Sequence, residues 1–393
     1  MSSPWLTIVG IGEDGLSGLS LASREALAKA EIVFGAERHL ALAEAGARGR
    51  PWPVPFDVAP VLACRGQQIV VLASGDPFYF GAGGSLAAHL NPEEWRAEPS
   101  PSTFSLAAAR LGWRLEDTLC FGLHAAPFER LMPVLGRGAR LICLVRDGDA
   151  VGALGRFLVT RGFGATRMWR LFALGGPREQ ISEHLASDVA LPLGAGPVAV
   201  ALDIEGGHGL SRASGLADNL FIHDGQITKR PSRALVLSAL APRPRHRLWD
   251  IGAGSGSISV EWALAGGVAD AIETRADRAA NIRANALAFG VEYRLSVIEG
   301  AAPSAFAELA PPDAVFVGGG LNAGMFDVLW PLIPIGARLV AHSVTLETEA
   351  LLTKLQNTHG GELLRMELSH SVPLGRMRSW EASRPVVQWS AVK

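Results

Sequence analysis

Cysteine is scarce in this chain, which has only Cys64, Cys120 and Cys143 among its 393 residues. Three thiols spread so widely form neither a disulfide framework nor a CxxC metal site, and this usage fits a reducing compartment. The histidines show no metal-ligand spacing, so we expect no bound metal. No run approaches about 18 consecutive apolar residues, and MSSPWLTIVGIG has no basic segment ahead of its apolar stretch. We therefore expect a cytoplasmic protein with no signal peptide and no membrane span.

Net charge is also low, at −2. Nucleic-acid binding needs a cationic excess on at least one face, so we expect no nucleic-acid partner. Lysine is nearly absent, with four residues against 32 arginines. That bias would suit carboxylate-rich small ligands, because a guanidinium binds a carboxylate through two parallel hydrogen bonds. The base composition of the genome explains the same bias.

Apolar residues, by contrast, are plentiful. They make up 48% of the chain against 19% charged residues, which excludes extensive disorder. The length favours two domains of roughly 200 residues. Short apolar runs that end at glycine-rich turns alternate with alanine-rich segments of helical spacing, which predicts an α/β architecture. We place a first domain at 1–205, a linker that leads into a second site at 206–230, and a second domain at 231–393.

The second domain is predicted to alternate helices and strands from residue 231 onward. It closes with two extended runs, GELLRMELSHS at 361–371 and RPVVQWSAV at 384–392, with no helix between them. Two such runs predict an antiparallel hairpin at the edge of the sheet.

A glycine-rich turn, WDIGAGSGSISVE at 249–261, follows the first predicted strand of this domain. Its three alternating glycines would let backbone N–H groups and a helix N-terminus approach a ligand closely, because no Cβ intervenes. A dinucleotide fingerprint needs a further glycine where Ser257 or Ser259 stands, so GxGxxG is not met. Glu273 ends the next predicted strand, where a carboxylate can accept both hydroxyls of a ribose. A tight strand-to-helix turn with no ligand remains the structural alternative.

This acid-x-GxGxG pattern with a second acid resembles the Rossmann-like class of S-adenosylmethionine-dependent methyltransferases. The resemblance implies a seven-stranded sheet with an antiparallel edge hairpin, and one bound S-adenosylmethionine. The residues that it assigns to this cofactor are Thr228, Asp250, Gly252, Ala253, Gly254, Ser255, Gly256, Glu273 and Ala302.

The N-terminal half contains four segments in a fixed order, namely VGIGEDG, SGDPFYFG, PSTFSLAAARLGW and FGLHAAP. Together they resemble the tetrapyrrole methylase family, a two-lobed α/β fold that binds S-adenosylmethionine between its lobes. The resemblance assigns Gly75, Asp76 and Thr103 to that cofactor, although a capped turn alone would also explain Asp76. Two departures stand out. Glu13 and Asp14 replace the usual Pro-Gly, and Ala-Ala follows His124 where Gly-Arg is expected.

The junction HDGQITKRPSRALVLSALAPRPRHRLWDIGAGSG resembles that of bifunctional precorrin methyltransferases of the cobalamin pathway. The resemblance implies methylation of one precorrin at carbons 5 and 15, with loss of carbon dioxide from the ring C acetate, which converts precorrin-6B to precorrin-8. Candidate catalytic residues are Lys229 and Arg233, together with Arg230, as cations for substrate carboxylates, and Glu347 near the decarboxylating centre. A solvated helix start explains the cations, and stabilisation of a helix dipole explains Glu347. VGGGL at 317–321 would let a flat macrocycle approach the backbone.

Two other functions remain open at this point. The N-terminal half could be a non-catalytic binding module beside a single C-terminal methyltransferase. A nicotinamide oxidoreductase is the second alternative, and the missing glycine of GxGxxG counts against it. We also expect a homo-oligomer.

Overall fold

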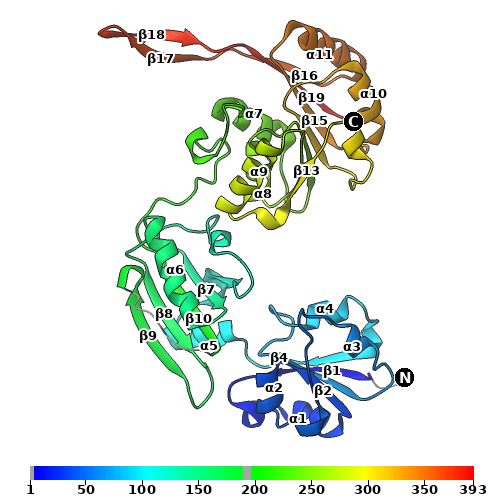
Figure 1. Ribbon diagram of the computed structural model, residues 1–393, viewed down its shortest axis with the longest axis vertical. Coiled ribbons are helices and arrows are strands. Elements are labelled where there is room, and N and C mark those ends of the chain that lie inside the picture. The colour runs from blue at the N-terminus through cyan, green and yellow to red at the C-terminus, as the bar shows by residue number, and fades with distance from the viewer. Residues whose placement is uncertain (1–3, 189–195) are drawn as a thin grey trace. The chain divides into compact units, whose positions relative to one another are not determined.

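The computed structural model describes residues 4–188 and 196–393. The chain divides into two compact units of unlike topology (Figure 1). Unit 1 comprises residues 1–126 and 136–208, and unit 2 comprises residues 127–135 and 209–393. Within the described ranges, no helix is long and apolar enough to cross a membrane.

The first sheet of unit 1 is parallel throughout, in the order β3-β2-β4-β1-β5. Val9, Val33 and Leu72 of its central strands are buried against helix α1, so the sheet is hydrophobic on that face. Its strands are β1 (Leu6–Ile11), β2 (Ile32–Gly35), β3 (Gly49–Pro51), β4 (Ile69–Ser74) and β5 (Trp95–Glu98), and its helices are α1 (Leu21–Lys29), α2 (Glu37–Leu42), α3 (Ala59–Leu62) and α4 (Gly83–Ala87). The carboxyl ends of these strands therefore lie along one edge of the sheet.

The second sheet of unit 1 is mixed, in the order β6-β7-β10-β8-β9. Strands β6 and β7 pair parallel, and the other neighbours pair antiparallel. Phe104 of helix α5 packs on this sheet with Ile142 and Trp169. The strands are β6 (Thr118–Gly122), β7 (Arg140–Val145), β8 (Arg167–Phe172), β9 (Gln180–Leu185) and β10 (Val198–Asp203), and the helices are α5 (Thr103–Leu111) and α6 (Gly148–Thr160). Unit 1 is therefore α/β, as predicted, and is built on two separate sheets.

Unit 2 is built on the predicted seven-stranded sheet, in the order β13-β12-β11-β14-β15-β19-β16. Neighbouring residues of one strand face opposite layers, as Leu248 packs with α7 and α8 and Trp249 packs with α10. The first five strands in that order are parallel, namely β13 (Leu295–Glu299), β12 (Val268–Glu273), β11 (Arg247–Ile251), β14 (Ala314–Val317) and β15 (Arg338–Ser343). The helices are α7 (Arg230–Leu240), α8 (Ser257–Leu264), α9 (Ala276–Ala288), α10 (Ala323–Leu332) and α11 (Leu346–His359).

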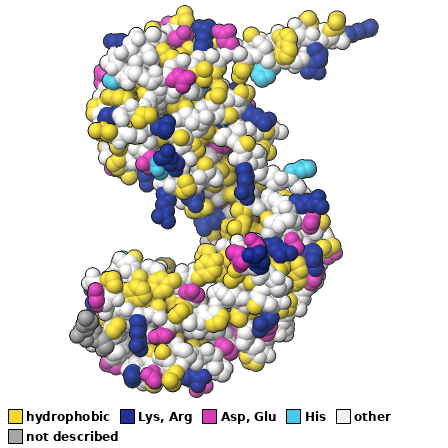
Figure 2. Space-filling view, turned by 180° about the vertical axis from the view of Figure 1, so that it is seen from behind, with side chains coloured by type: hydrophobic (Ala, Val, Ile, Leu, Met, Phe, Trp, Pro, Cys, Tyr) yellow, Lys and Arg dark blue, Asp and Glu magenta, His cyan; other side chains and the backbone are white. Residues whose placement is uncertain are grey.

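The C-terminal strands refine the expected edge hairpin. β16 (Glu362–Met366) and β19 (Val386–Val392) do pair antiparallel, but β19 lies between β15 and β16, which leaves β16 at the edge. The connection between them forms a further two-stranded ribbon, β17 (Ser369–Leu374) with β18 (Met377–Ala382), which was not predicted. The ribbon projects from the sheet (Figure 1). It exposes hydrophobic side chains (Figure 2).

Two tryptophans test this arrangement of the last strands. Trp389 on β19 is fully buried and its Nε1 donates to the carbonyl of Gly360 at 2.9 Å, whereas Trp380 on β18 is 75% exposed. Trp389→Ala should lower the stability of unit 2 by about 3–5 kcal/mol, and the control Trp380→Ala should change it by less than about 0.5 kcal/mol. Hydrogen exchange of peptides from β15 in the full chain measures both. Equal effects would contradict an internal β19.

Candidate functional site

The glycine-rich turn of unit 2 joins β11 to α8 at the carboxyl edge of the parallel strands. Gly252, Gly254 and Gly256 have φ of +69°, +59° and +71°, a left-handed conformation that residues with a Cβ rarely adopt. A Cβ on Gly256 would lie 2.7 Å from Cγ2 of Ile282 on α9, which explains that glycine by packing. A Cβ on Gly252 would meet nothing within 4 Å, so the turn is open to a ligand there.

The segment before α7 lies beside this turn. A Cβ on Gly254 would be 3.2 Å from the carbonyl oxygen of Gln226, two residues before Thr228. The segment that carries the predicted cofactor residue Thr228 therefore lies beside the glycine turn, although Thr228 and Gly252 are 24 residues apart in sequence.

Glu273 is buried at the end of β12, next to the same turn. Its carboxylate accepts the backbone N–H of Gly254 at 2.9 Å and that of Arg275 at 3.0 Å. The glycine turn and the acid at the end of β12 are therefore in direct contact. Since Oε2 of Glu273 accepts the N–H of Gly254, this carboxylate also stabilises the conformation of the turn.

Asp250, one position before the end of β11, is almost fully buried. Its Oδ2 accepts the hydroxyl of Ser259 at 2.6 Å and the backbone N–H of Ser259 at 3.2 Å. Its Oδ1, and the hydroxyl of Ser255, have no hydrogen-bond partner among the described residues. Buried polar atoms are normally paired, so these two atoms fit a site that a polar ligand completes.

Two further loops reach this edge of the sheet. Ala302 follows β13, and the N–H of Gly300 donates to the carbonyl of Glu273 at 3.0 Å. A Cβ on Gly318, which follows β14, would lie 3.4 Å from the carbonyl oxygen of Gly252. Gly319 and Gly320 would meet nothing within 4 Å. The loops after β11, β12, β13 and β14 therefore surround one open surface, as expected for parallel strands.

The structure corrects the expectation that Arg233 binds substrate. Its side chain is fully buried, where Nε donates to Glu261 at 2.6 Å and Nη2 donates to Asp218 at 3.0 Å. Its guanidinium also donates to the carbonyls of Leu216 and Thr228. Burial requires such partners for a charge, so Arg233 fixes the segment that leads to the turn and does not reach a ligand.

The other proposed catalytic residues lie on the surface. Lys229 is the N-cap residue of α7, and Arg230 is the first residue of that helix, and both are exposed. Glu347 is exposed in the first turn of α11, where Thr345 caps the helix. That position agrees with the helix-dipole interpretation of Glu347.

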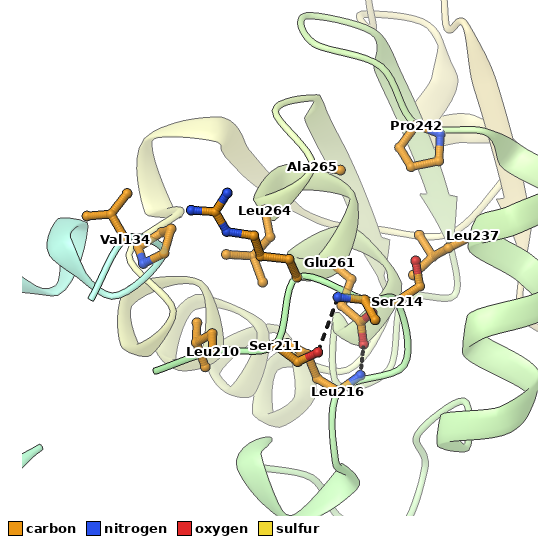
Figure 3. A pocket seen from close by; sticks show the side chains of 13 residues that line it. Val134, Leu210, Ser211, Ser214, Leu216, Leu237, Pro242, Glu261, Leu264 and Ala265 are labelled. Carbon is orange, nitrogen blue, oxygen red and sulfur yellow. Dashed lines mark hydrogen bonds between the residues drawn. The ribbon is translucent and has the colours of Figure 1, made fainter. Parts of the chain in front are cut away.

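A pocket of about 360 Å³ in unit 2 lies at the opposite end of α8 from the glycine turn, lined by Leu264 and Ala265 (Figure 3). The buried carboxylate in its lining, Glu261, accepts the N–H of Gly215 at 2.7 Å and that of Leu216 at 2.9 Å. These bonds join residues 215 and 216 to α8, and residues 209–230 belong to unit 2. They lie within the stretch 206–230 that the sequence assigned to a linker leading into a second site. The pocket is therefore part of this packing and is separate from the glycine turn.

Unit 1 contains a larger cavity, of about 790 Å³, which both of its sheets line. Gly75 and Thr103, which the sequence assigned to a cofactor, line this cavity, and so does His124. Gly75 has φ of +55°, and a Cβ there would lie 2.7 Å from the carbonyl oxygen of Pro101. Oδ1 of Asp76 accepts the N–H of Phe78 at 2.8 Å. This bond forms the capped turn that the sequence offered as an alternative to a cofactor role for Asp76.

Comparisons with known proteins match both units. The family model for tetrapyrrole (corrin/porphyrin) methylases matches residues 5–190, and that for the precorrin methyltransferase domain matches residues 219–393. A Sinorhizobium protein named precorrin-6Y C(5,15)-methyltransferase (decarboxylating) is 45% identical over 402 residues, which are 100% of this chain and 97% of that protein. The chain belongs to the precorrin-6Y C(5,15)-methyltransferase (decarboxylating) family. The resemblance inferred from sequence is thus confirmed.

Two shorter relatives of this family member each match part of it. A Saccharolobus solfataricus protein named probable cobalt-precorrin-6B C(15)-methyltransferase (decarboxylating) is 36% identical over 142 residues, covering 34% of this chain and 71% of its own. A Salmonella typhimurium protein named cobalt-precorrin-7 C(5)-methyltransferase is 33% identical over 166 residues, covering 40% of this chain and 80% of its own.

Sequence reasoning missed one polar cluster in the unit 1 cavity of this precorrin-6Y methyltransferase family member. Glu13, Arg38, His39 and Ser74 all line the cavity. The one signal in the sequence was the departure at Glu13 from the Pro-Gly of related sequences. Arg38 and His39 belong to no recognised motif, and the fold alone brings them to Ser74.

Asp250 gives this family member a testable pH dependence. Burial raises the pKa of Asp250 from its ordinary 3.8 to about 6, against hydrogen bonds from Ser259 that lower it. Between pH about 4 and about 6, Asp250 therefore stays protonated in the native state but is ionised in the unfolded state. The contribution of this proton to the free energy of unfolding is fully present below pH about 4. It is lost as the pH rises through about 6, a change of about 3 kcal/mol.

Asp250→Asn cannot lose a proton and keeps an oxygen for Ser259. Relative to the wild type, it should gain about 3 kcal/mol of stability between pH 4 and pH 7. Hydrogen exchange of α8 peptides in the full chain measures the difference at each pH. The exposed Asp277→Asn is the control and should show no gain. A difference for Asp250→Asn that does not change with pH would show that Asp250 is ionised throughout.

Proposed function

We propose that this chain methylates one precorrin at carbons 5 and 15 and removes carbon dioxide from its ring C acetate, converting precorrin-6B to precorrin-8 in cobalamin biosynthesis. The observation that carries the proposal is the presence of two unlike α/β units, each with a glycine turn at its parallel strand ends. In unit 2 the turn is open at Gly252, and in unit 1 Gly75 lines the cavity. The full-length relative bears a name that combines both transfers, and the shorter relatives bear one each.

The residues of unit 2 fit S-adenosylmethionine, which supplies an activated methyl group when bound. Glu273 is placed to accept ribose hydroxyls, and the open face of Gly252 allows close approach of the ligand. Oδ1 of Asp250 and the hydroxyl of Ser255 offer unpaired polar atoms. We propose the same cofactor in the cavity of unit 1, beside Gly75 and Thr103, so that each unit holds one.

Methyl transfer needs alignment and exclusion of water rather than a strong base. Bound S-adenosylmethionine would supply its methyl group to an electron-rich ring carbon and leave as the neutral thioether, so that the substrate would carry the positive charge spread over its macrocycle. When carbon 15 is methylated, this charge is conjugated to ring C. The bond to the acetate carboxylate then breaks, carbon dioxide leaves, and its electron pair neutralises the macrocycle. Decarboxylation therefore follows the carbon 15 transfer, which we place in unit 2, with the carbon 5 transfer in unit 1.

Two substitutions separate the transfers. Gly75 cannot accept a side chain without moving Pro101, so Thr103→Arg is the better choice to fill the unit 1 site. Ala253→Arg does the same in unit 2, at a position that already has a Cβ. Ala253→Arg should abolish carbon 15 methylation and carbon dioxide release together, while Thr103→Arg should lose only the carbon 5 methyl. Labelled methyl counting and carbon dioxide trapping measure both. Carbon dioxide release at the normal rate by Ala253→Arg would refute the coupling.

The expected homo-oligomer and cytoplasmic location stay proposals. The projecting ribbon supports self-association, because Leu374, Met377 and Trp380 are 65%, 76% and 75% exposed. Light scattering that finds a monomer at micromolar concentration would exclude the oligomer, and fractionation of cells would test the location.

A further inference from the structure

The polar cluster in the unit 1 cavity forms at the ends of three parallel strands. Glu13 follows β1, Ser74 is the last residue of β4, and Arg38 and His39 lie in α2, which follows β2. Nη2 of Arg38 is 3.1 Å from Oγ of Ser74 and 3.0 Å from Nε2 of His39. Oγ of Ser74 is 2.8 Å from the same Nε2. Ser74 is exposed, and it directly precedes Gly75 of the proposed cofactor site.

Charge in this cluster is not balanced. Arg38 forms an ion pair with Glu13, and Arg178 forms a second one with the same carboxylate at 3.1 Å. His39 is neutral, because burial and the nearby Arg38 lower the pKa of the imidazole to about 4. Two guanidinium groups thus face one carboxylate. Burial, followed by repulsion from Arg178, lowers the pKa of the Arg38 guanidinium, so an added anion would be favourable there.

The hydrogen-bond donors point to the kind of anion. Arginine only donates, so Nε2 of His39 accepts from Arg38, and the Ser74 hydroxyl can donate to His39 or to a ligand. Glu13 fixes one side of the guanidinium, and the side chain of Arg38 is 34% exposed. A guanidinium beside a hydroxyl matches the two oxygens of a carboxylate.

We propose that Arg38 and Ser74 bind a carboxylate side chain of the tetrapyrrole in unit 1, and that Glu13 positions the Arg38 guanidinium. This inference rests on the proposed function, since it names where that substrate is held. Ser74 and Gly75 are adjacent in sequence, so a carboxylate anchored at Ser74 places one edge of the macrocycle beside the proposed methyl donor. Glu13, which stands where the tetrapyrrole methylase family usually has Pro-Gly, thereby gains a positioning role.

The test compares Arg38→Gln with wild type in the carbon 5 transfer. Loss of a charged hydrogen-bond partner should raise the KM for the tetrapyrrole about tenfold or more, with kcat changed less than about twofold. Arg38→Lys should lie between the two because it keeps charge but loses the planar fork. Arg50→Gln is the control, since Arg50 is an exposed arginine of β3 whose guanidinium donates to backbone carbonyls. The carbon 15 transfer of each variant is an internal control and should be unchanged.

A binding measurement gives a second readout. Equilibrium dialysis should show weaker binding of a metal-free corrin with free acetate and propionate groups to Arg38→Gln, whereas its permethyl ester should bind variant and wild type alike. Calorimetry with S-adenosylmethionine checks that unit 1 is folded. If Arg38→Gln disrupts that binding, Ser74→Ala is measured instead and should raise the KM in the same direction. Unchanged KM and corrin affinity in a folded variant would overturn the inference. A wild type that transfers no methyl to carbon 5 would instead refute the proposed function.

Discussion

Both units depend on backbone segments that meet where a side chain would not fit. In unit 1, a Cβ on Gly10 would overlap the carbonyl oxygen of Gly75, and a Cβ on Gly75 would lie 2.8 Å from Cα of Ser102. In unit 2, the three glycines of the turn have a left-handed backbone, and a Cβ on Gly256 would lie 2.7 Å from Cγ2 of Ile282. This constraint keeps side chains away from the backbone where the parallel strands end. Two unrelated sheets thereby offer the same kind of surface to a small ligand.

A buried charge network holds the unit 2 surface in place. Arg233 and Glu261 are both buried, and between them they bind the backbone at 215, 216 and 228. Breaking such a pair leaves an uncompensated charge, which costs about 3–5 kcal/mol. The network therefore ties α7, α8 and the segment beside the glycine turn into one body. The sequence predicted Arg233 to be a substrate ligand, because the residues around a cation near a cofactor motif do not indicate whether its side chain is buried.

Features that depend on residues close together in the sequence could be predicted from it. The strand β11, its glycine turn and Glu273 were readable because strand, turn and acid occur at fixed spacing. The ribbon β17–β18 was missed since its side chains are mostly exposed and lack a clear alternation of burial. Residues 127–135 belong to unit 2, where Nε of Arg130 donates to Glu292 at 2.8 Å. These two residues are 162 positions apart in sequence, so no local pattern indicates their contact. The cluster around Arg38 was hidden for the same reason, because the fold alone brings it together.

The central claim is that each unit binds one S-adenosylmethionine at its own glycine turn. Calorimetric titration of the full-length chain tests this most directly, since it counts sites without any need for the tetrapyrrole. We predict two sites per chain in the wild type, and one remaining site in Thr103→Arg and in Ala253→Arg. A single site in the wild type, lost in Ala253→Arg and unaffected by Thr103→Arg, would contradict the claim and would make the N-terminal unit a binding module without a methyl donor.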